Sequence, residues 1–588
     1  MRNAAISLSI ALLGLSVAPR ADAATPSPAM GRDGMVVTSQ VDATVAGHAM
    51  LALGGNAIDA AVASAFAIGV TQPFSTGIGG GGFILIHLAG EGGGEVIAID
   101  ARETAPAAAS RDMYLVDGVA SDASVRGGLA VATPGLVRGL LSVQQDYGRL
   151  PLATVMAPAI RLAREGFAIS PYHARMIGFM RQRLPADDPR FAETARIQFP
   201  PEGTTALPGW RLVQHDLADT LQAIAERGDA AFYGGPTARA IAQAVAAAGG
   251  LLTEADLAGY GVRRRPAVVG SYRGFEVFSF PPPSSGGVAL LEILNVLEGF
   301  DLAERPLGSS ASIHLIAEAM KLAFADRAVH LGDPDFVEIP VARLTSKEYA
   351  AEQRARINPP WFRRAPWTWG RREHAIRVKA PGQLHDDAGT THLSTSDAWG
   401  NAVAITETIN TPYGSGITVP GTGILLDNEM DDFSKKPFEP NAYGLIDTRG
   451  ANAIAPGKRP LSSMTPTILR KDGQLFMVTG SPGGPRIIST TLLAILGVVD
   501  YGLDVKAAVS APRFHHQWVP DVLAVEPSVA LDVVEALRAR GHDAQPGRRE
   551  WSAAESIVID SETGWHYGGN DPRRDGLALG FSAPGDDR

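Results

Sequence analysis

The residue types best suited to chemistry gather in a threonine- and serine-rich stretch, Thr390–Asp397, and in a second stretch at residues 401–410. Both stretches alternate in character along the chain, and the short loop between them contains a glycine, so together they predict a β-hairpin. If the hairpin closes directly across that loop, Thr390 lies opposite Thr408 at its open end. The two hydroxyls would then be neighbours.

Side chains of a strand point alternately to its two faces, so the predicted hairpin has two different surfaces. One face is small and polar, and the other is apolar, which suits a strand that lines a pocket on one side and packs on a core on the other. The polar face carries Thr390, His392, Ser394, Ala402, Ala404, Thr406, Thr408 and Asn410, and the apolar face carries Val403, Ile405 and Ile409.

Thr390 is a candidate nucleophile, but a threonine hydroxyl needs a base close by. No histidine is obviously placed to serve. If the chain were cut between Gly389 and Thr390, the new α-amine, with a pKa near 7.7–8.0, would stand beside the hydroxyl and act as that base. For the hairpin taken alone, an ordinary threonine-rich surface hairpin remains the alternative.

Long sequence blocks on both sides of this junction resemble the γ-glutamyltransferase family (γ-glutamyl transpeptidases, glutathione hydrolases). They cover nearly the whole chain after its first residues, in the family's order. The blocks after the junction are TTHLSTSDAWGNAVAITETIN (390–410), GILLDNEMDDF (423–433), KRPLSSMTPTI (458–468), GSPGGPRI (480–487) and APRFHHQW (511–518). Those before it are GGNAIDAAVA (54–63), GIGGGGFILI (77–86), DARETAP (100–106) and PPPSSGG (281–287).

The resemblance implies a fold and a way of maturing. The fold is the α/β (α+β) sandwich of N-terminal-nucleophile hydrolases, with αββα layers. The chain would cut itself between Gly389 and Thr390 into a large subunit, residues 24–389, and a small catalytic subunit, residues 390–588. The two subunits would stay associated as one domain.

The resemblance also assigns roles to residues in the matching blocks. Thr390 is the nucleophile, Thr408 hydrogen-bonds it and assists processing, and Gly483 and Gly484 supply the backbone N–H groups that stabilise the oxyanion. The remaining matches bind substrate: Arg102, Ser462 and Ser463 hold its α-carboxylate, Glu429 and Asp432 hold its α-ammonium, Asn410 adds a further contact, and Tyr443 tips a lid loop.

The chemistry of these residue types agrees with a γ-glutamyl substrate. A guanidinium grips a carboxylate through two parallel hydrogen bonds, and glycine lets the backbone approach a reacting carbonyl. Each residue also has a plainer interpretation when its block is ignored. Arg102 could form a surface ion pair with Glu103, residues 429–432 an acidic loop, residues 481–484 a turn, and Tyr443 could sit by chance in a surface loop.

The implied activity is cleavage of γ-glutamyl amides such as glutathione through a γ-glutamyl-threonine ester, with transfer to water, amino acids or peptides and no cofactor. The closest alternative is a cephalosporin or glutaryl acylase on the same scaffold, which would dispense with Glu429 and Asp432. A solute-binding protein for glutathione is the alternative from another class. Glu407 departs from the family's usual neutral residue, which leaves acceptor preference open.

Composition indicates an exported globular enzyme. Residues 1–23 combine a basic start, a short apolar stretch and a small-residue cleavage site, so they predict a signal peptide, a periplasmic or secreted protein and no stable membrane span. The chain of 588 residues has no cysteine, so its stability must come from core burial, for which 45% hydrophobic residues suffice. A net charge of −10 argues against nucleic-acid binding. The arginine- and tryptophan-rich residues 361–377 predict a mobile segment before the junction.

Three motifs suggest sites that their context does not support. Residues 77–82 fit a dinucleotide-binding glycine pattern, but a predicted helix precedes them and a strand follows, the reverse of that fold. His515 and His516 are adjacent, so they point to opposite faces and do not predict a metal site. Residues 281–287 predict a rigid turn into a helix over 288–297 rather than a nucleophilic serine.

Overall fold

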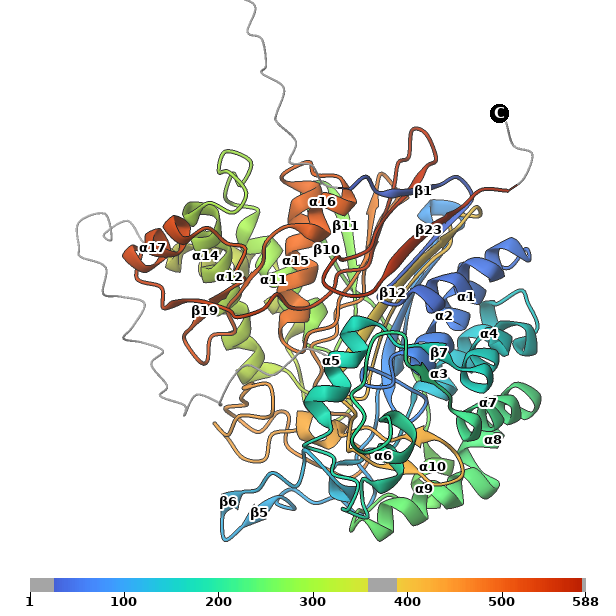
Figure 1. Ribbon diagram of the computed structural model, residues 1–588. Coiled ribbons are helices and arrows are strands. Elements are labelled where there is room, and N and C mark those ends of the chain that lie inside the picture. Colours follow the sequence, from blue (N-terminus) through green and yellow to red (C-terminus); the bar gives the residue numbers. More distant parts are fainter. Residues whose placement is uncertain (1–25, 358–388, 584–588) are drawn as a thin grey trace, which may run out of the picture.

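The computed structural model describes residues 26–357 and 389–583. Two seven-stranded antiparallel sheets stack face to face, and helices cover their outer faces (Figure 1). The layers are therefore helix, sheet, sheet, helix, which confirms the αββα sandwich. The predicted signal peptide at residues 1–23 and the predicted mobile segment at 361–377 lie outside the described residues.

The first sheet holds the predicted hairpin at its centre. Its order is β23 (Leu577–Phe581), β2 (Gly34–Thr38), β12 (Thr390–Asp397), β13 (Ala402–Thr408), β3 (Gly81–Leu88), β4 (Glu95–Ala101) and β9 (Arg263–Pro266). The register pairs Thr390 with Thr408, and the Asp397 N–H donates to the Asn401 carbonyl across the turn, as the sequence predicts. Strand β12 also pairs with β2, so this sheet combines strands from both sides of the Gly389–Thr390 junction.

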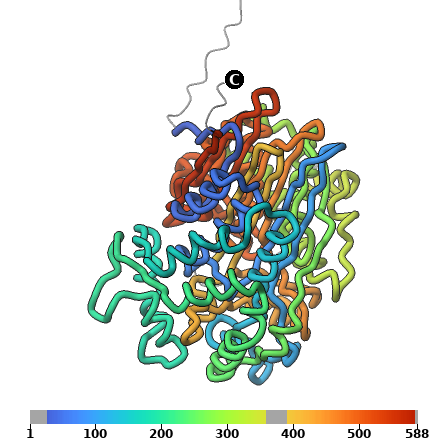
Figure 2. Tube along the Cα trace, turned by 90° about the vertical axis from the view of Figure 1, so that its right-hand side faces the viewer, coloured from blue at the N-terminus to red at the C-terminus, as the bar shows by residue number. Residues whose placement is uncertain are grey.

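The second sheet is built in the same mixed way. Its order is β1 (Ala29–Gly31), β22 (His566–Gly569), β21 (Ser556–Ile559), β17 (Gln474–Thr479), β16 (Thr467–Lys471), β11 (Phe275–Ser279) and β10 (Val268–Tyr272). The turned view shows the first strands of the chain beside its last ones (Figure 2). Because both sheets interleave the two sides of the junction, a cut there would leave two fragments with one shared core.

Helices pack on each outer face. On the first sheet lie α1 (Val41–Ala52) and α2 (Ala57–Thr71), against which Val403 and Ile405 of β13 are buried. On the second sheet lie α11 (Gly286–Leu297), α12 (Ser310–His330), α15 (Arg486–Val499) and α16 (Val505–Ser510). The other longer helices are α3 (Leu136–Tyr147), α4 (Leu152–Glu165), α5 (Pro171–Met180), α7 (His215–Arg227), α9 (Gly235–Ala247), α14 (Lys347–Arg356) and α17 (Leu531–Ala539).

The space between the sheets is apolar at one end and polar at the other. Phe83 and Phe280 stack there with ring centroids 4.1 Å apart, beside Ala402 and Ala404 of the hairpin. The predicted polar face of the hairpin therefore faces the second sheet, and only its open end, at Thr390 and Thr408, reaches a cavity. The half of this face that carries Ala402 and Ala404 therefore packs in the core and does not line the cavity.

Local signals fix the elements that frame the site. Asn56 begins α2 with a capping box, in which its side chain accepts from the Asp59 N–H and the Asp59 carboxylate accepts from the Asn56 N–H. Helix α2 precedes the glycine-rich residues 77–82 and β3 follows them, so the discounted dinucleotide site is confirmed as a helix-to-strand connection.

Among the described residues, no helix combines the length and apolarity needed to cross a bilayer.

Candidate active site

Thr390, at the first position of β12, is buried with only a twentieth of its surface exposed. Its Oγ1 lies 3.0 Å from Thr408 Oγ1. The Thr408 hydroxyl donates to the Gly389 carbonyl over 2.8 Å and accepts from the Asn410 N–H over 2.8 Å. One consistent direction of donation follows: Thr390 donates to Thr408, and Thr408 donates to the carbonyl beside the junction.

The Gly389 carbonyl has a second donor, the Ile409 N–H at 3.2 Å. Two donors on one carbonyl oxygen would stabilise the charge that develops there when a neighbouring hydroxyl attacks its carbon. The residue must also be glycine, because an added Cβ would collide with the carbonyl of Asn410. The surroundings of the junction are therefore arranged for attack by Thr390 on the preceding peptide bond.

His392, two residues along the same strand face, is not the base. Its ring nitrogens lie 2.8 Å from Thr406 Oγ1 and 3.2 Å from Ser394 Oγ, and burial lowers its pKa to about 3. It is a neutral, hydrogen-bonded part of the core. No histidine or lysine is among the described residues that line the cavity of Thr390, and the Arg102 guanidinium there is a permanently charged donor.

One cavity brings together every residue predicted for the site except Gly483. Its lining consists of Arg102, Thr390, Thr408, Asn410, Glu429, Asp432, Tyr443, Leu445, Leu461, Ser462, Ser463, Met464, Gly484 and Ile487. The side chains come from opposite ends of the sequence, on β12, β13, the end of β4, the short 3-10 helix Glu429–Asp432 and the start of α15. Gly483 lies next to the lining residue Gly484.

Arg102 is completely buried at the end of β4, so the interpretation as a surface ion pair is wrong. It contacts Glu103 over 3.4 Å, as that interpretation had it, but it also donates to Glu429 and, over 2.5 Å, to Asp432. Its Nε donates to the Pro460 carbonyl over 3.1 Å. These bonds use four of the five guanidinium N–H groups.

Carboxylates outnumber the arginine in this acidic cluster, which consists of Arg102, Glu103, Asp427, Glu429 and Asp432. Burial raises the pKa of Glu103 to about 8, although Arg102 opposes the shift. Burial likewise raises the pKa of Glu429 and of Asp432, with Arg102 again opposing it. Burial and the neighbouring carboxylates disfavour the charged forms of these acids, and a cationic group bound beside them would stabilise those forms.

Several polar atoms in the cavity wall lack partners within the described protein. Glu429 Oε2 and Ser463 Oγ are buried without a hydrogen bond. Ser462 Oγ accepts from the Met464 N–H, which leaves its own proton free to donate. Buried polar atoms are nearly always paired, so these atoms mark where a ligand's ammonium and carboxylate would bind.

Gly484 and Tyr443 form the wall beyond the nucleophile. Gly484 has φ of 55°, and a Cβ there would come within 2.6 Å of the Tyr443 ring. The Tyr443 hydroxyl donates to the carbonyl of Asn410. The half-buried ring of Tyr443 therefore forms part of the cavity wall, and its role on a lid loop stays a prediction.

Comparison with known proteins shows the family to which the chain belongs. The sequence model described as Gamma-glutamyltranspeptidase matches residues 43–581. The chain belongs to the γ-glutamyltranspeptidase family. The resemblance that the sequence blocks carry is therefore confirmed over almost all of the described chain.

Proteins similar to this chain include some named as glutathione hydrolases and others named as acylases. The glutathione hydrolase proenzyme of Escherichia coli strain K12 is 44% identical over 560 residues, 94% of this chain and 93% of that protein. The acylase ACY 1 proenzyme of Pseudomonas sp. strain SE83 is 42% identical over 524 residues, 88% of each. The crystal structure of cephalosporin acylase from Bacillus halodurans superposes with a TM-score of 0.83 at 30% identity, covering 97% of this chain and 100% of that one.

Sequence reasoning missed two buried carboxylates that lie close to Arg102 and Glu429 but do not line the cavity. Asp427 was overlooked and Glu103 was considered only as a surface partner, although both carboxylates are buried in the acidic cluster. The block at residues 423–433 holds four acidic residues, and that density was the available signal. Glu407, by contrast, points away as the alternation predicts: it pairs with Thr391, and no atom of it lines the cavity.

The other discounted sites remain discounted. His515 hydrogen-bonds Ser489 and Gln517, while His516 faces Asp521, so the adjacent histidines share no ligand position. Ser284 and Ser285 donate to backbone carbonyls of Met464 and Ser462, and α11 begins directly after them at Gly286, two residues earlier than predicted. Both segments are architectural.

Proposed function

We propose that this protein is a glutathione hydrolase and γ-glutamyltransferase that acts through Thr390. The proposal rests on one observation in the cavity that holds the Thr390 hydroxyl. Glu429 and Ser463 line this cavity with Arg102, and each has a buried oxygen atom without a hydrogen bond. A γ-glutamyl group presents an α-ammonium, an α-carboxylate and a remote amide carbonyl. These fit Glu429 with Asp432, Arg102 with the two serines, and Thr390, respectively.

Maturation begins with attack of Thr390 Oγ1 on the Gly389 carbonyl carbon. The carbonyl oxygen takes up negative charge beside the Thr408 hydroxyl and the Ile409 N–H, the C–N bond breaks, and the acyl group moves from nitrogen to oxygen. The shift frees the α-amine of Thr390, which takes up the hydroxyl proton, and water then hydrolyses the ester to release the Gly389 carboxylate and the Thr390 hydroxyl. The products are a large subunit, residues 24–389 after removal of residues 1–23, and a small subunit, residues 390–588.

Turnover reuses the same hydroxyl. The α-amine of Thr390, directly or through a water molecule, takes the hydroxyl proton as Thr390 attacks the γ-carbonyl. The backbone N–H groups of Gly483 and Gly484 stabilise the oxyanion, and the amine leaves with the proton. Water or an amino-acid amine then resolves the γ-glutamyl ester while Tyr443 restricts access to it.

A glutaryl or cephalosporin acylase is the second candidate, since a relative named as an acylase is nearly as similar as one named as a hydrolase. Glutaryl groups carry no α-ammonium, so they would leave the Glu429 and Asp432 carboxylates unmatched. The retention of both acids in the cavity favours γ-glutamyl donors.

The N-terminal residues also support export, and we propose a periplasmic or secreted enzyme.

The test compares the native chain with Thr390→Ala. Intact mass spectrometry should find two fragments that meet at Gly389–Thr390 in the native protein and one chain in the variant. The neighbouring Thr391→Ala is the matched control: the Thr391 hydroxyl bonds Ser39 on the other strand face, so that variant should still split. A small fragment beginning at any residue other than Thr390 would remove the nucleophile assignment.

The substrate class is tested with the processed enzyme and two anilides. Because a buried charge contact contributes about 2–5 kcal/mol, kcat/KM for γ-glutamyl p-nitroanilide should exceed that for glutaryl p-nitroanilide by about 30-fold or more. Equal values, or a preference for the glutaryl compound, would identify the acylase instead.

A further inference from the structure

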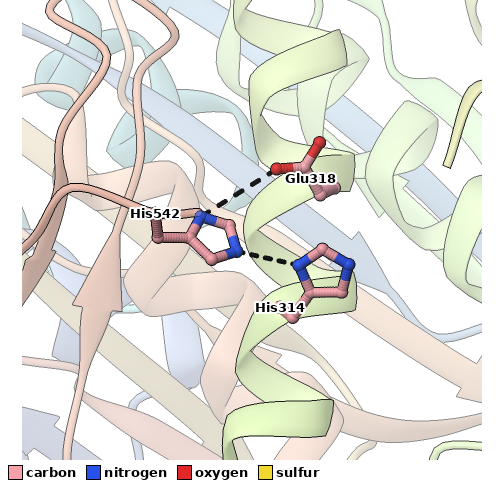
Figure 3. Close-up of side chains that lie close together, drawn as sticks. All are labelled: His314, Glu318 and His542. Atoms are coloured by element: carbon pink, nitrogen blue, oxygen red, sulfur yellow. Dashed lines mark hydrogen bonds and ion pairs between the residues drawn. The ribbon is translucent and has the colours of Figure 1, made fainter. Parts of the chain in front are cut away.

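A second cluster of ligating side chains lies outside the catalytic cavity, on the helical layer over the second sheet (Figure 3). His314 and Glu318 are four residues apart on α12 and so share one face of that helix. His542 faces them from the turn that follows α17. His314 Nδ1 lies 2.8 Å from His542 Nε2, and His542 Nδ1 lies 3.9 Å from Glu318 Oε1.

The three residues offer one ligand atom each, and these atoms lie within 4.8 Å of one another. Imidazole nitrogen and carboxylate oxygen are the ligand types that zinc binds, at about 2.0–2.2 Å. Atoms at that radius on a tetrahedral ion are roughly 3.3 Å apart. Bringing this cluster to that geometry requires the two rings to part slightly and the partly exposed Glu318 carboxylate to move inward.

The charges around the cluster favour a cation. Lys321 lies between two carboxylates, with its Nζ 3.3 Å from Glu318 Oε1 and 3.4 Å from Asp521 Oδ1. Two carboxylates against one ammonium leave one negative charge unbalanced. Lys321 can stay paired with Asp521, which also faces His516 over 3.1 Å, when Glu318 turns to an ion.

We propose that His314, Glu318 and His542 form a zinc site with its fourth position open to water. The sequence alone does not suggest the site, since 228 positions separate the two histidines.

The ligands come from both sides of the Gly389–Thr390 junction. His314 and Glu318 precede it and His542 follows it, so a bound ion would join the two proposed subunits. This consequence rests on the proposed cleavage, whereas zinc binding itself does not. An ion bound only by the assembled cluster stabilises the folded protein by mass action.

The test measures zinc bound by the full chain, after treatment with EDTA and equilibrium dialysis against zinc chloride at pH 7.5. The native protein should bind one equivalent, and zinc should raise its thermal midpoint. His542→Asn and His314→Asn should lose the equivalent and the shift, and Glu318→Gln should bind about tenfold more weakly or worse. His330→Gln is the matched control, because His330 ends the same helix outside the cluster.

Cobalt(II) supplies a second readout. Its visible absorption reports a four-coordinate nitrogen and oxygen site in the native protein, and His542→Asn should abolish that band while keeping the metal-free thermal midpoint of a folded chain. Equal zinc binding by the native protein and both histidine variants would overturn the proposal, as would binding below one equivalent at zinc concentrations up to 100 μM. Loss of Thr390 chemistry would not affect either readout, so failure here is distinct from failure of the proposed function.

Discussion

Two of the buried charge clusters among the described residues differ in the balance of their charges. The acidic cluster around Arg102 sets one guanidinium against four carboxylates. The paired cluster, which consists of Arg513, Glu526, Asp571 and Arg573, sets two guanidinium groups against two carboxylates. None of the paired cluster's residues lines the catalytic cavity.

The pKa shifts follow this balance. In the paired cluster, burial alone would raise the pKa of Asp571, but Arg513 and Arg573 outweigh it and lower the value. In the acidic cluster, burial prevails over Arg102 and raises the pKa of Asp432. A charge-balanced cluster holds a fold together, whereas an unbalanced one with unbonded oxygens is completed by a ligand.

The largest effect is expected from breaking the paired cluster. Asp571→Asn leaves the buried Arg513, which donates to that carboxylate, without its ionic partner. Removing one member of a buried ion pair costs about 3–5 kcal/mol, so we expect a large fall in the thermal midpoint. Asp219→Asn is the control, because Asp219 pairs with Arg164 at the surface and should cost at most about 1 kcal/mol. Similar midpoints for the two variants would show that the paired cluster has no such structural role.

The acidic cluster should respond in activity rather than in stability. Asp432→Asn removes one carboxylate from an excess, so the thermal midpoint should change little. The kcat/KM for γ-glutamyl p-nitroanilide should fall by about 30-fold or more, since a charged contact of about 2–5 kcal/mol to the substrate ammonium is lost. Glutaryl p-nitroanilide, which lacks that ammonium, is the control substrate. Parallel losses with both substrates would place Asp432 outside ammonium recognition.

Arg102→Lys sharpens the comparison within the acidic cluster. Lysine keeps the charge but loses the planar guanidinium, whose N–H groups donate to Glu429 and Asp432 and leave one for a substrate carboxylate. We expect a KM for γ-glutamyl donors raised on the order of tenfold, with self-cleavage intact, because the bonds at Gly389 do not involve Arg102. A matching fall in kcat would add a role in positioning the reacting carbonyl. If the Arg102→Lys chain failed to split, Arg102 would have a structural role rather than a role in substrate binding.

The difference between the two clusters also explains what the sequence could predict. Local rules sufficed for the hairpin, because alternation and a three-residue loop fix the pairing of Thr390 with Thr408. The motif blocks sufficed for most of the cavity. The contacts of Arg102 with Glu429 and Asp432 span more than 320 positions, so only the fold shows that these groups bond each other.

Two further features also needed the structure. The pair of Arg102 and Glu103 is buried rather than at the surface, because exposure depends on which other parts of the chain cover a residue. The sequence also does not show that Ala402 and Ala404 pack against the second sheet, because alternation indicates which residues share a face but not which sheet packs on that face. The sequence therefore predicts which residues share a face more reliably than what that face contacts.

The smallest expected effect is a change in how stability depends on pH. Glu103 has a pKa near 4.5 when exposed and about 8 in the folded protein, where burial disfavours its charge. The folded state therefore holds this proton more tightly than the unfolded state, and stability must fall as pH rises from about 4.5 through 8. Glu103→Gln, a neutral mimic of the protonated acid, should match the native thermal midpoint near pH 4 and exceed it by a margin that grows up to pH 8, reaching on the order of 1–3 °C. Asp571 has the opposite sign, because its lowered pKa contributes stability that is lost only as pH falls below about 4. Midpoints measured from pH 5 to 9 that ran parallel in the native protein and in Glu103→Gln would mean that Glu103 is ionised throughout, and the acidic cluster would then hold its charges as firmly as the paired one.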